Sequence, residues 1–276
     1  MVKPAAYREA VGFLQSEFEM SERRACRVLG FRRSSHRYVH RRTLVPALLA
    51  ELRAHAAARP RFGYRRIHVL LRRGGWRVNH KRVYRIYRAE GLAVRRRKRK
   101  RIAIGLRTVL PPPTRPNERW SMDFTLDTMA SGRKFRTFNV VDDFTRECLA
   151  IEVDTSIGGA RVVRVLDRIA ASRGLPNLVV CDNGPEFTGK VLDAWAYEVG
   201  LKIHFIRPGK PVENCYVESF NGKFRDECLN DHWFIGLKDA NDKIEDWRID
   251  YNEVRPHSSL GDLTPKEYSS THGLAS

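Results

Sequence analysis

The charged residues of this 276-residue chain are segregated along its length, and this limits what the chain can fold into. Residues 1–110 hold 30 Lys and Arg against 6 Glu, and no aspartate precedes Asp123. Residues 111–276 hold 21 basic and 26 acidic residues. This pattern predicts a polyanion-binding region joined to a domain of another kind. Nucleic acid is the expected polyanion, because contacts from Lys and Arg to phosphate supply most non-specific affinity. The alternatives are a ribosomal-type basic protein or a solubilising surface.

The composition excludes several classes of protein. No apolar run approaches the ~18–20 residues of a membrane span, and the N-terminus lacks the pattern of a signal peptide. The hydrophobic fraction of 42% suits one large or two modest domains. The odd number of cysteines, with no C-x-x-C, argues against a disulfide framework or a thiolate zinc site and for a reducing compartment. We therefore expect a cytoplasmic protein. The cysteines are Cys26, Cys148, Cys181, Cys215 and Cys228.

Residues 1–42 predict a first helix-turn-helix region. Ser21 is the expected N-cap of its second helix, and Gly30 follows that helix as a stop. Ser34 and Ser35 can cap a further helix. The expected inward positions are Tyr7, Val11, Leu14, Ala25, Val28 and Leu29, and the expected outward ones are Arg37, His40 and Arg41.

Residues 43–92 predict a second helix-turn-helix region. A connecting helix over 43–58 precedes helices at Tyr64–Arg73 and Lys81–Arg88, which are joined by a Gly74–Gly75 turn and capped by Asn79. The expected inward positions are Leu48, Leu49, Leu52, Ile67, Leu70, Leu71, Val83, Ile86 and Tyr87. The outward basic residues expected to contact DNA are Lys81, Arg82, Arg85 and Arg88.

Residues 93–117 predict a basic, proline-rich linker. Seven consecutive basic residues occupy Arg95–Arg101, and such a run repels itself and will not fold alone. It is either a solvated linker or a tether that follows the phosphate backbone, in which case Arg95, Arg96, Arg97 and Lys98 contact DNA. Pro111–Pro113 and Pro116 give a stiff connection, and we place the domain boundary there.

Residues 118–276 change to the periodicity of an α/β domain. Three strands in a meander are followed by alternating helices and strands, which predicts a mixed five-stranded sheet flanked by helices. The expected strands are Trp120–Thr125, Arg136–Val141, Cys148–Val153, Leu178–Cys181 and Lys202–Phe205. The expected helices are Val162–Ala171, Leu192–Val199, Val217–Leu229 and Leu237–Tyr251, with a loop at Pro208–Pro211. Trp120, Trp195 and Trp247 are expected in the core.

Three carboxylates are singled out by their positions. Asp123 lies inside an otherwise apolar strand, where a charge costs several kcal/mol without compensation. Asp182 directly follows the apolar strand VVC, at the end where α/β sheets bind ligands. Glu218 lies early in a helix, with 35 residues separating it from Asp182.

Converging carboxylates repel each other unless cations lie between them. Oxygen ligands suit Mg²⁺ or Mn²⁺, and a pair of such ions stabilises an in-line phosphoryl displacement. The predicted cofactor is therefore Mg²⁺ or Mn²⁺, in two copies, and the predicted chemistry is phosphodiester cleavage or exchange.

Four other carboxylates are rivals for this role. Asp142 and Asp143 are better interpreted as turn residues. Glu186 is expected to face solvent or to cap a nearby helix, and Glu213 to lie beside the site.

The segments WSMDFT, VVDDFTRE, CDNGPEF, KPVENCYVESFNGKFRDECLN and YNEVRPHSSLGDLTPKEY together resemble the catalytic core of retroviral-integrase-type transposases. More narrowly, they resemble the OrfB proteins of the IS-three family of bacterial insertion sequences. The segment RPRFGYRRIHVLLRRGGWRVNHKRVYRIYRAEGL is similar to the helix-turn-helix segment of the same proteins. The resemblance implies a ribonuclease-H-like fold in which Asp123, Asp182 and Glu218 bind metal and catalyse the reaction.

The resemblance reaches further residues. Asn183 follows the second aspartate, as in the family, and is expected to orient it by hydrogen bonding. Asn214, Asn221 and Arg225 fall with Glu218 on one helical face, which could hold the DNA end or be an ordinary polar face. Lys210 is expected in a loop over the site. The residues that match the C-terminal motif, with packing and DNA contact both open as roles, are Tyr251, Asn252, Arg255, His257 and Ser258.

The sequence therefore predicts a DDE transposase that cleaves the ends of a mobile element and transfers the freed 3′-OH to another phosphodiester. Holding two DNA ends together predicts self-association. The resemblance also implies a partner from the upstream frame, the OrfA product, whose segment this chain is expected to lack. The alternatives are a metal-dependent nuclease that does not join DNA, and a DNA-binding regulator that uses only residues 1–92.

Overall fold

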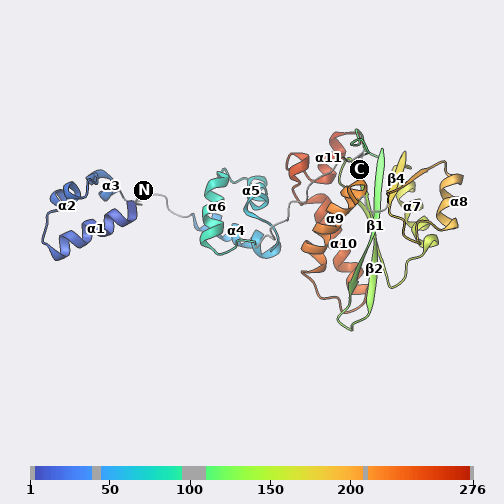
Figure 1. The fold of residues 1–276 in the computed structure, drawn as a ribbon, viewed down its shortest axis with the longest axis horizontal. Coiled ribbons are helices and arrows are strands. Elements are labelled where there is room, and N and C mark those ends of the chain that lie inside the picture. The colour runs from blue at the N-terminus through green and yellow to red at the C-terminus, as the bar shows by residue number, and fades with distance from the viewer. Residues whose placement is uncertain (1–3, 39–44, 95–109, 208–210, 274–276) are drawn as a thin grey trace. The chain divides into compact units, whose positions relative to one another are not determined.

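The computed structural model describes residues 4–38, 45–94, 110–207 and 211–273 (Figure 1). The chain divides into two compact units, Met1–Leu48 and Leu49–Ser276. The predicted division into four regions, at 1–42, 43–92, 93–117 and 118–276, stays a prediction. Arg95, Arg96, Arg97, Lys98 and Lys210 lie outside the described residues.

The first unit contains three helices, α1 (Pro4–Glu17), α2 (Glu22–Val28) and α3 (Arg33–Arg37). Val11, Ala25 and Cys26 are buried at their junction. Ser21 caps α2 as predicted, since its side chain accepts a hydrogen bond from Arg24 N.

Two predictions in this unit are wrong. Val28 is 61% exposed, because Cys26 completes the inward face of the short helix α2 with Ala25. Ser34 and Ser35 do not cap α3, because the helix begins one residue earlier and Arg32 is its N-cap.

The second helical region agrees with its prediction. It contains α4 (Pro46–Ala58), α5 (Tyr64–Arg73) and α6 (His80–Ala89), and the Asn79 side chain caps α6 by accepting from Lys81 N at 2.8 Å. Gly75 turns the chain between α5 and α6 with φ +89°, a backbone conformation that favours glycine. The predicted inward residues that are buried are Leu48, Leu52, Ile67, Leu70, Leu71, Val83, Ile86 and Tyr87.

The remaining residues form a mixed sheet in the order β3-β2-β1-β4-β5. Strands β1 (Arg119–Thr128), β2 (Lys134–Asp142) and β3 (Cys148–Asp154) form an antiparallel meander. Strands β4 (Leu178–Cys181) and β5 (Lys202–Phe205) continue the sheet in parallel with β1. All five predicted strands and the mixed sheet are confirmed, and β1 is the central strand.

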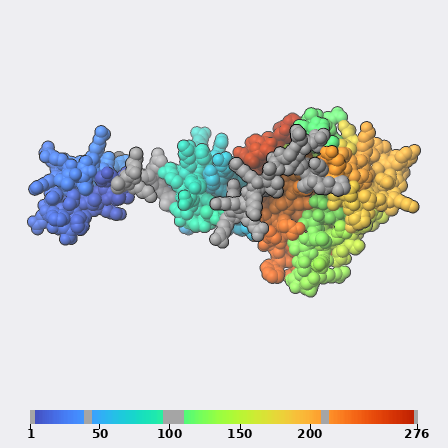
Figure 2. Space-filling model, viewed as in Figure 1, coloured from blue at the N-terminus to red at the C-terminus, as the bar shows by residue number. Residues whose placement is uncertain are grey.

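Helices cover both faces of this sheet (Figure 1). Helices α7 (Gly159–Arg173) and α8 (Lys190–Glu198) cover one face, where Trp120 and Trp195 are buried as predicted. Helices α9 (Cys215–Phe224) and α10 (Leu237–Glu253) cover the other, where Trp247 packs partly buried. In the space-filling view, the sheet and its covering helices, coloured green to red, form one continuous domain (Figure 2). No helix in the described ranges is long and apolar enough to cross a membrane.

The C-terminal third differs from prediction in three places. The expected helix Val217–Leu229 is α9 followed by a π-helical turn at Arg225–Leu229, and a 3-10 turn at Pro211–Asn214 precedes α9. A further helix, α11 (Pro265–Thr271), was not predicted, although Thr264 and Glu267 form a capping box at its start.

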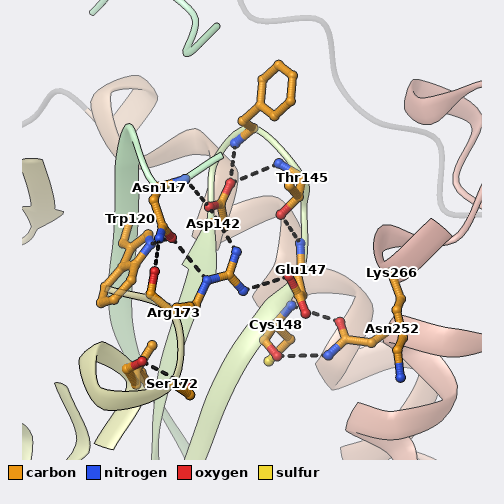
Figure 3. A network of polar contacts seen from close by, with 12 residues as sticks. Asn117, Trp120, Asp142, Thr145, Glu147, Cys148, Ser172, Arg173, Asn252 and Lys266 are labelled. Atoms are coloured by element: carbon orange, nitrogen blue, oxygen red, sulfur yellow. Dashed lines mark hydrogen bonds and ion pairs between the residues drawn. The ribbon is translucent and has the colours of Figure 1, made fainter. Parts of the chain in front are cut away.

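Polar side chains fasten the turn between β2 and β3 to its surroundings (Figure 3). The Asp142 carboxylate accepts hydrogen bonds from Asn117 N, Phe144 N and Thr145 N, so this residue shapes the turn as predicted. At the start of β3, the Asn252 amide accepts from Cys148 N and donates to Cys148 O, both at 2.9 Å. Asn252 therefore joins the end of α10 to the edge strand.

We expect Asn252→Ala to lower the free energy of unfolding by ~1–3 kcal/mol, because the buried Cys148 N–H loses its acceptor. Urea denaturation measures the change. Asn241→Ala is the matched control on the same helix, since Asn241 is exposed and bonds only within α10, to Leu237 O. Equal, small losses for both variants would contradict this role for Asn252.

Candidate active site

Strand register brings Asp123 and Asp182 together. In the parallel pairing of β1 with β4, Ser121 lies opposite Val180. Asp123 and Asp182 each follow two residues later, so both carboxylates leave neighbouring strands at the same level and on the same face. This face is the one that α9 covers, because Asn221 of α9 bonds Asp123.

Helix α9 is fixed against this part of β1 by two asparagine side chains. Asn221 Nδ2 donates to Asp123 Oδ2 at 2.8 Å, and Asn221 Oδ1 accepts from Asn139 Nδ2 of β2 at 2.8 Å. Asn214, at the N-cap of α9, donates to Met122 O at 3.3 Å. These bonds set the height and rotation of the helix that carries Glu218.

Two of the three carboxylates, Asp123 and Glu218, have raised pKa values. Burial raises the pKa of Asp123 to about 6, helped by the negative charge of Asp182 and opposed by hydrogen bonds from Phe124 N and Asn221. Burial and the charge of Asp123 also raise the pKa of Glu218. Within the described residues, none of the three carboxylates has a basic side chain within 4 Å, as the ion pairs there lie elsewhere.

The three carboxylates are neighbours but do not form a closed metal cage. No group of three His, Cys, Asp or Glu side chains in the described part of the chain lies close enough to hold a metal ion. The donor set consists of carboxylate oxygens alone, which fits Mg²⁺ or Mn²⁺ and does not fit a zinc site.

The loop after β4 differs from two predictions. Asn183 donates to Ile206 O at 2.7 Å and so ties the loop to the end of β5, while Asp182 is oriented by Gly184 N at 3.0 Å. Glu186 neither faces solvent nor caps a helix, because it pairs with Arg136, which lies over the Phe124 ring. This pair could not be predicted from local sequence patterns, since its members are 50 residues apart.

Gly184 is required at the centre of this loop. A Cβ at this position would lie 3.0 Å from Asp182 Oδ1 and 3.2 Å from Glu186 Oε2, which is closer than side chains normally approach. The glycine therefore allows two carboxylates to flank one backbone position.

The predicted DNA-contacting residues have different environments. Lys81, Arg85 and Arg88 are exposed on α6, and Arg82 is half-buried. Arg225 is exposed at the end of α9 and donates to Leu126 O at 3.3 Å. Asn214 is only 2% exposed, and Asn221 points at Asp123, so these two side chains face the protein interior.

The remaining acidic candidates have structural partners. Glu213 accepts hydrogen bonds from Arg207 N and Arg207 Nε, and Asp143 pairs with buried Arg119. Sequence reasoning missed Asn139, whose amide links Asn221 to Thr125. The sequence did contain a sign of Asn139, because a polar residue within the apolar strand segment FNVV is as unusual as Asp123 in its own strand.

A mixed sheet of this order, with two carboxylates on adjacent central strands and a third on the covering helix, defines a ribonuclease-H-like core of the integrase type. Comparison with known proteins agrees. Residues 113–211 and 199–265 match models described as an integrase core domain, and residues 47–100 match an HTH-like domain.

Individual relatives extend the match over the whole chain. The insertion element IS407 uncharacterized 31.7 kDa protein of Burkholderia multivorans is 49% identical over 94% of each chain. A protein named as the transposase InsK for insertion sequence element IS150 of Escherichia coli is 30% identical, covering 76% of this chain and 78% of its own. The chain therefore belongs to the integrase-core family of insertion-sequence transposases, and it is a transposase of the DDE type.

A solved structure supports the fold. The structure of a simian T-cell lymphotropic virus intasome in complex with PP2A regulatory subunit B56 gamma contains a chain that aligns with a TM-score of 0.52 and 13% identity. The alignment covers 82% of this chain and 76% of that one.

We expect metal-free Asp123→Asn to be more stable than the wild type at pH 8, by on the order of 1 kcal/mol after solvent screening, or ~2–4 °C in Tm. The Asp123 pKa is about 6 in the fold against 3.8 for a free side chain, so the ionised carboxylate opposes folding above pH 6. This difference should shrink as the pH falls from 6 towards 4, where the folded protein keeps the proton. Thermal unfolding with a chelator present measures it.

Asp127→Asn is the control, because Asp127 lies on the same strand and, among the described residues, its side chain accepts a hydrogen bond only from its neighbour Thr128 N. Added Mn²⁺ should make the wild type more stable than Asp123→Asn, because only the wild type keeps the Asp123 carboxylate that would bind the ion. An Asp123→Asn protein that is less stable than the wild type at pH 8 without metal would contradict this description of the site.

Proposed function

We propose that the chain cleaves DNA at the ends of an insertion sequence and joins the freed 3′-OH to target DNA, with Asp123, Asp182 and Glu218 as the catalytic, metal-binding residues. The observation that carries the proposal is the β1–β4 register, which sets Asp123 beside Asp182 on the face covered by α9. The raised pKa values of Asp123 and Glu218 support it, because burial and the charge of a neighbouring carboxylate cause these shifts and such perturbed groups cluster at functional sites.

The metal would be Mg²⁺ or Mn²⁺, in two copies, held by carboxylate oxygens of the three residues. When bound, two such ions stabilise the entering and leaving oxygens of an in-line phosphoryl displacement. The protein supplies orientation: Asn221 and Phe124 N hold both oxygens of Asp123, and Gly184 N holds Asp182. Asn139 holds Asn221 in this orientation by donating a hydrogen bond to its Oδ1, and Asn139 itself donates to Thr125 Oγ1.

DNA binding would be divided between two parts of the chain. The exposed basic residues of α6 would position the element end, with Lys81, Arg85 and Arg88 in direct contact and Arg82 at the margin. Arg225 would bind a phosphate beside the active site, since it follows Glu218 by two turns on the same face of α9. Asn214 and Asn221 are better explained as anchors of α9 than as DNA contacts.

Partners beyond DNA follow from the reaction. Two element ends must be held together with the target, which favours assembly of two or more copies of the chain. The resemblance to OrfB proteins suggests the upstream-frame OrfA product as a further partner, either separate or fused.

The test uses the purified chain, Mg²⁺ and a labelled duplex that carries the terminal repeat of the element. We expect nicked and joined products, and a loss of about 10³-fold or more in Asp182→Asn and Glu218→Gln, because each substitution removes a carboxylate that would hold the metal ions. Asp127→Asn is the matched carboxylate control and should keep wild-type activity.

The other outcomes decide between functions. Metal-dependent nicking without joining, with OrfA supplied, would favour a nuclease. Tight binding of the terminal repeat without any cleavage under the same conditions would leave a DNA-binding regulator.

A further inference from the structure

Most of the C-terminal motif, at residues 251–258, is buried. Tyr251 is 1% exposed, Arg255 2%, His257 3% and Asn252 5%, whereas Ser258 is exposed. Side chains as deeply buried as the first four cannot reach DNA, which leaves packing as their role. Arg255 requires a further explanation, because burying a guanidinium is costly unless it is paired and hydrogen-bonded.

Arg255 forms a two-pronged ion pair with Glu227. Arg255 Nε donates to Glu227 Oε2 and Arg255 Nη2 donates to Glu227 Oε1, both at 2.7 Å. The exposed fractions of the two side chains are 2% and 8%. Burial would raise the pKa of Glu227, but the hydrogen bonds and charges of Arg255 and Arg66 outweigh it and lower the pKa. The pair is thus fully charged and fixed in both distance and angle.

Glu227 lies in the π-helical turn Arg225–Leu229 that continues directly from α9. This turn is closed by Asn230 N donating to Arg225 O at 2.9 Å, a five-residue step instead of the usual four. Isolated π-turns are rare and are often found at functional sites. Here the turn places Glu227 towards Arg255 while Cys228 and Leu229 remain buried.

The carboxylate of Glu218 depends on the rotation of α9. Among the described residues no side chain forms a hydrogen bond or ion pair with it, so the helix sets where its Cβ lies and its own rotamers do the rest. Asn214 and Asn221 hold the start and middle of the helix, and the Glu227–Arg255 pair holds its end. A turn of α9 about its axis would move Glu218 relative to Asp123 and Asp182.

We propose that Arg255 and Glu227 are positioning residues that fix the rotation of α9 and thereby aim the Glu218 carboxylate at the metal site. This inference rests on the proposed function of the three carboxylates. A buried ion pair usually contributes little net stability compared with apolar residues of similar volume, so its value here is geometric. Arg255 must be arginine, because the two-pronged contact needs the planar guanidinium.

The test compares Arg255→Lys and Glu227→Gln with the wild type in the full chain. We expect both variants to bind Mn²⁺ ~10-fold more weakly, the lower end of what loss of a supporting residue costs a metal site. The electron paramagnetic resonance signal of free Mn²⁺ measures this affinity without any need for DNA cleavage. Arg255→Lys keeps the positive charge, so a weaker Mn²⁺ affinity in this variant reports the geometric role of the guanidinium.

Glu147→Gln is the matched control, because it breaks the pair with Arg173, formed at 2.7 Å by partly buried side chains that do not touch α9. It should lower the Tm but leave Mn²⁺ affinity within twofold of the wild type. Glu227→Gln keeps the shape of the side chain and serves if the lysine variant does not fold.

Wild-type Mn²⁺ affinity in Arg255→Lys, or an equal loss in Glu147→Gln, would overturn the inference. A wild type that binds Mn²⁺ through Asp123 but does not cleave DNA would contradict the proposed function, and the Mn²⁺ comparison would still decide this inference. A wild type that binds no Mn²⁺ would contradict both.

Discussion

The burial of Asp123 in the central strand is the constraint on which the rest of the core depends. A carboxylate there is unfavourable, and the fold compensates it with Phe124 N and the Asn221 amide. Asn221 can reach Asp123 only when α9 lies across β1 at one height and rotation. The position of α9 depends in turn on two further contacts. Asn139 of β2 donates a hydrogen bond to Asn221, and Arg255 pairs with Glu227 in the turn that follows α9. The buried Asp123 carboxylate thus accounts for the polar contacts that link β2, β1, α9 and the segment after α10.

The two faces of the sheet have separate tasks. The face under α7 and α8 is apolar and contains the aromatic cluster of Phe124, Phe138 and Phe187. The face under α9 alternates between apolar core and a polar strip that includes Thr125 and Asn139. The packed apolar face under α7 and α8 stabilises the sheet, and the opposite face, under α9, can therefore contain carboxylates that repel each other. This division would suit the proposed metal site, because its ligands must be held in place by their surroundings.

Much of this could be predicted from sequence, because the relevant signals are local. The five strands follow from alternating or continuous apolar runs, and Asp123 and Asp182 are conspicuous because each interrupts or ends such a run. The π-helical turn could not be predicted, since residues 217–229 have the periodicity of a continuous helix and the partner of Glu227 in this turn, Arg255, lies 28 residues further along the chain. The pairing of Glu186 with Arg136 and the turn of Asn221 towards Asp123 were missed for the same reason: each depends on a partner 50 or more residues away. Helix α11 was missed although Thr264 and Glu267 are a recognisable capping pair.

The most direct test of this account is a crystal structure with Mn²⁺, with the ions located by their anomalous scattering. We expect an anomalous peak shared by Asp123 and Asp182, with Glu218 turned towards it and the Asn221–Asp123 hydrogen bond retained. Manganese bound elsewhere, or bound at Asp123 with Glu218 turned away in every copy, would contradict the claim that these three carboxylates form one metal site.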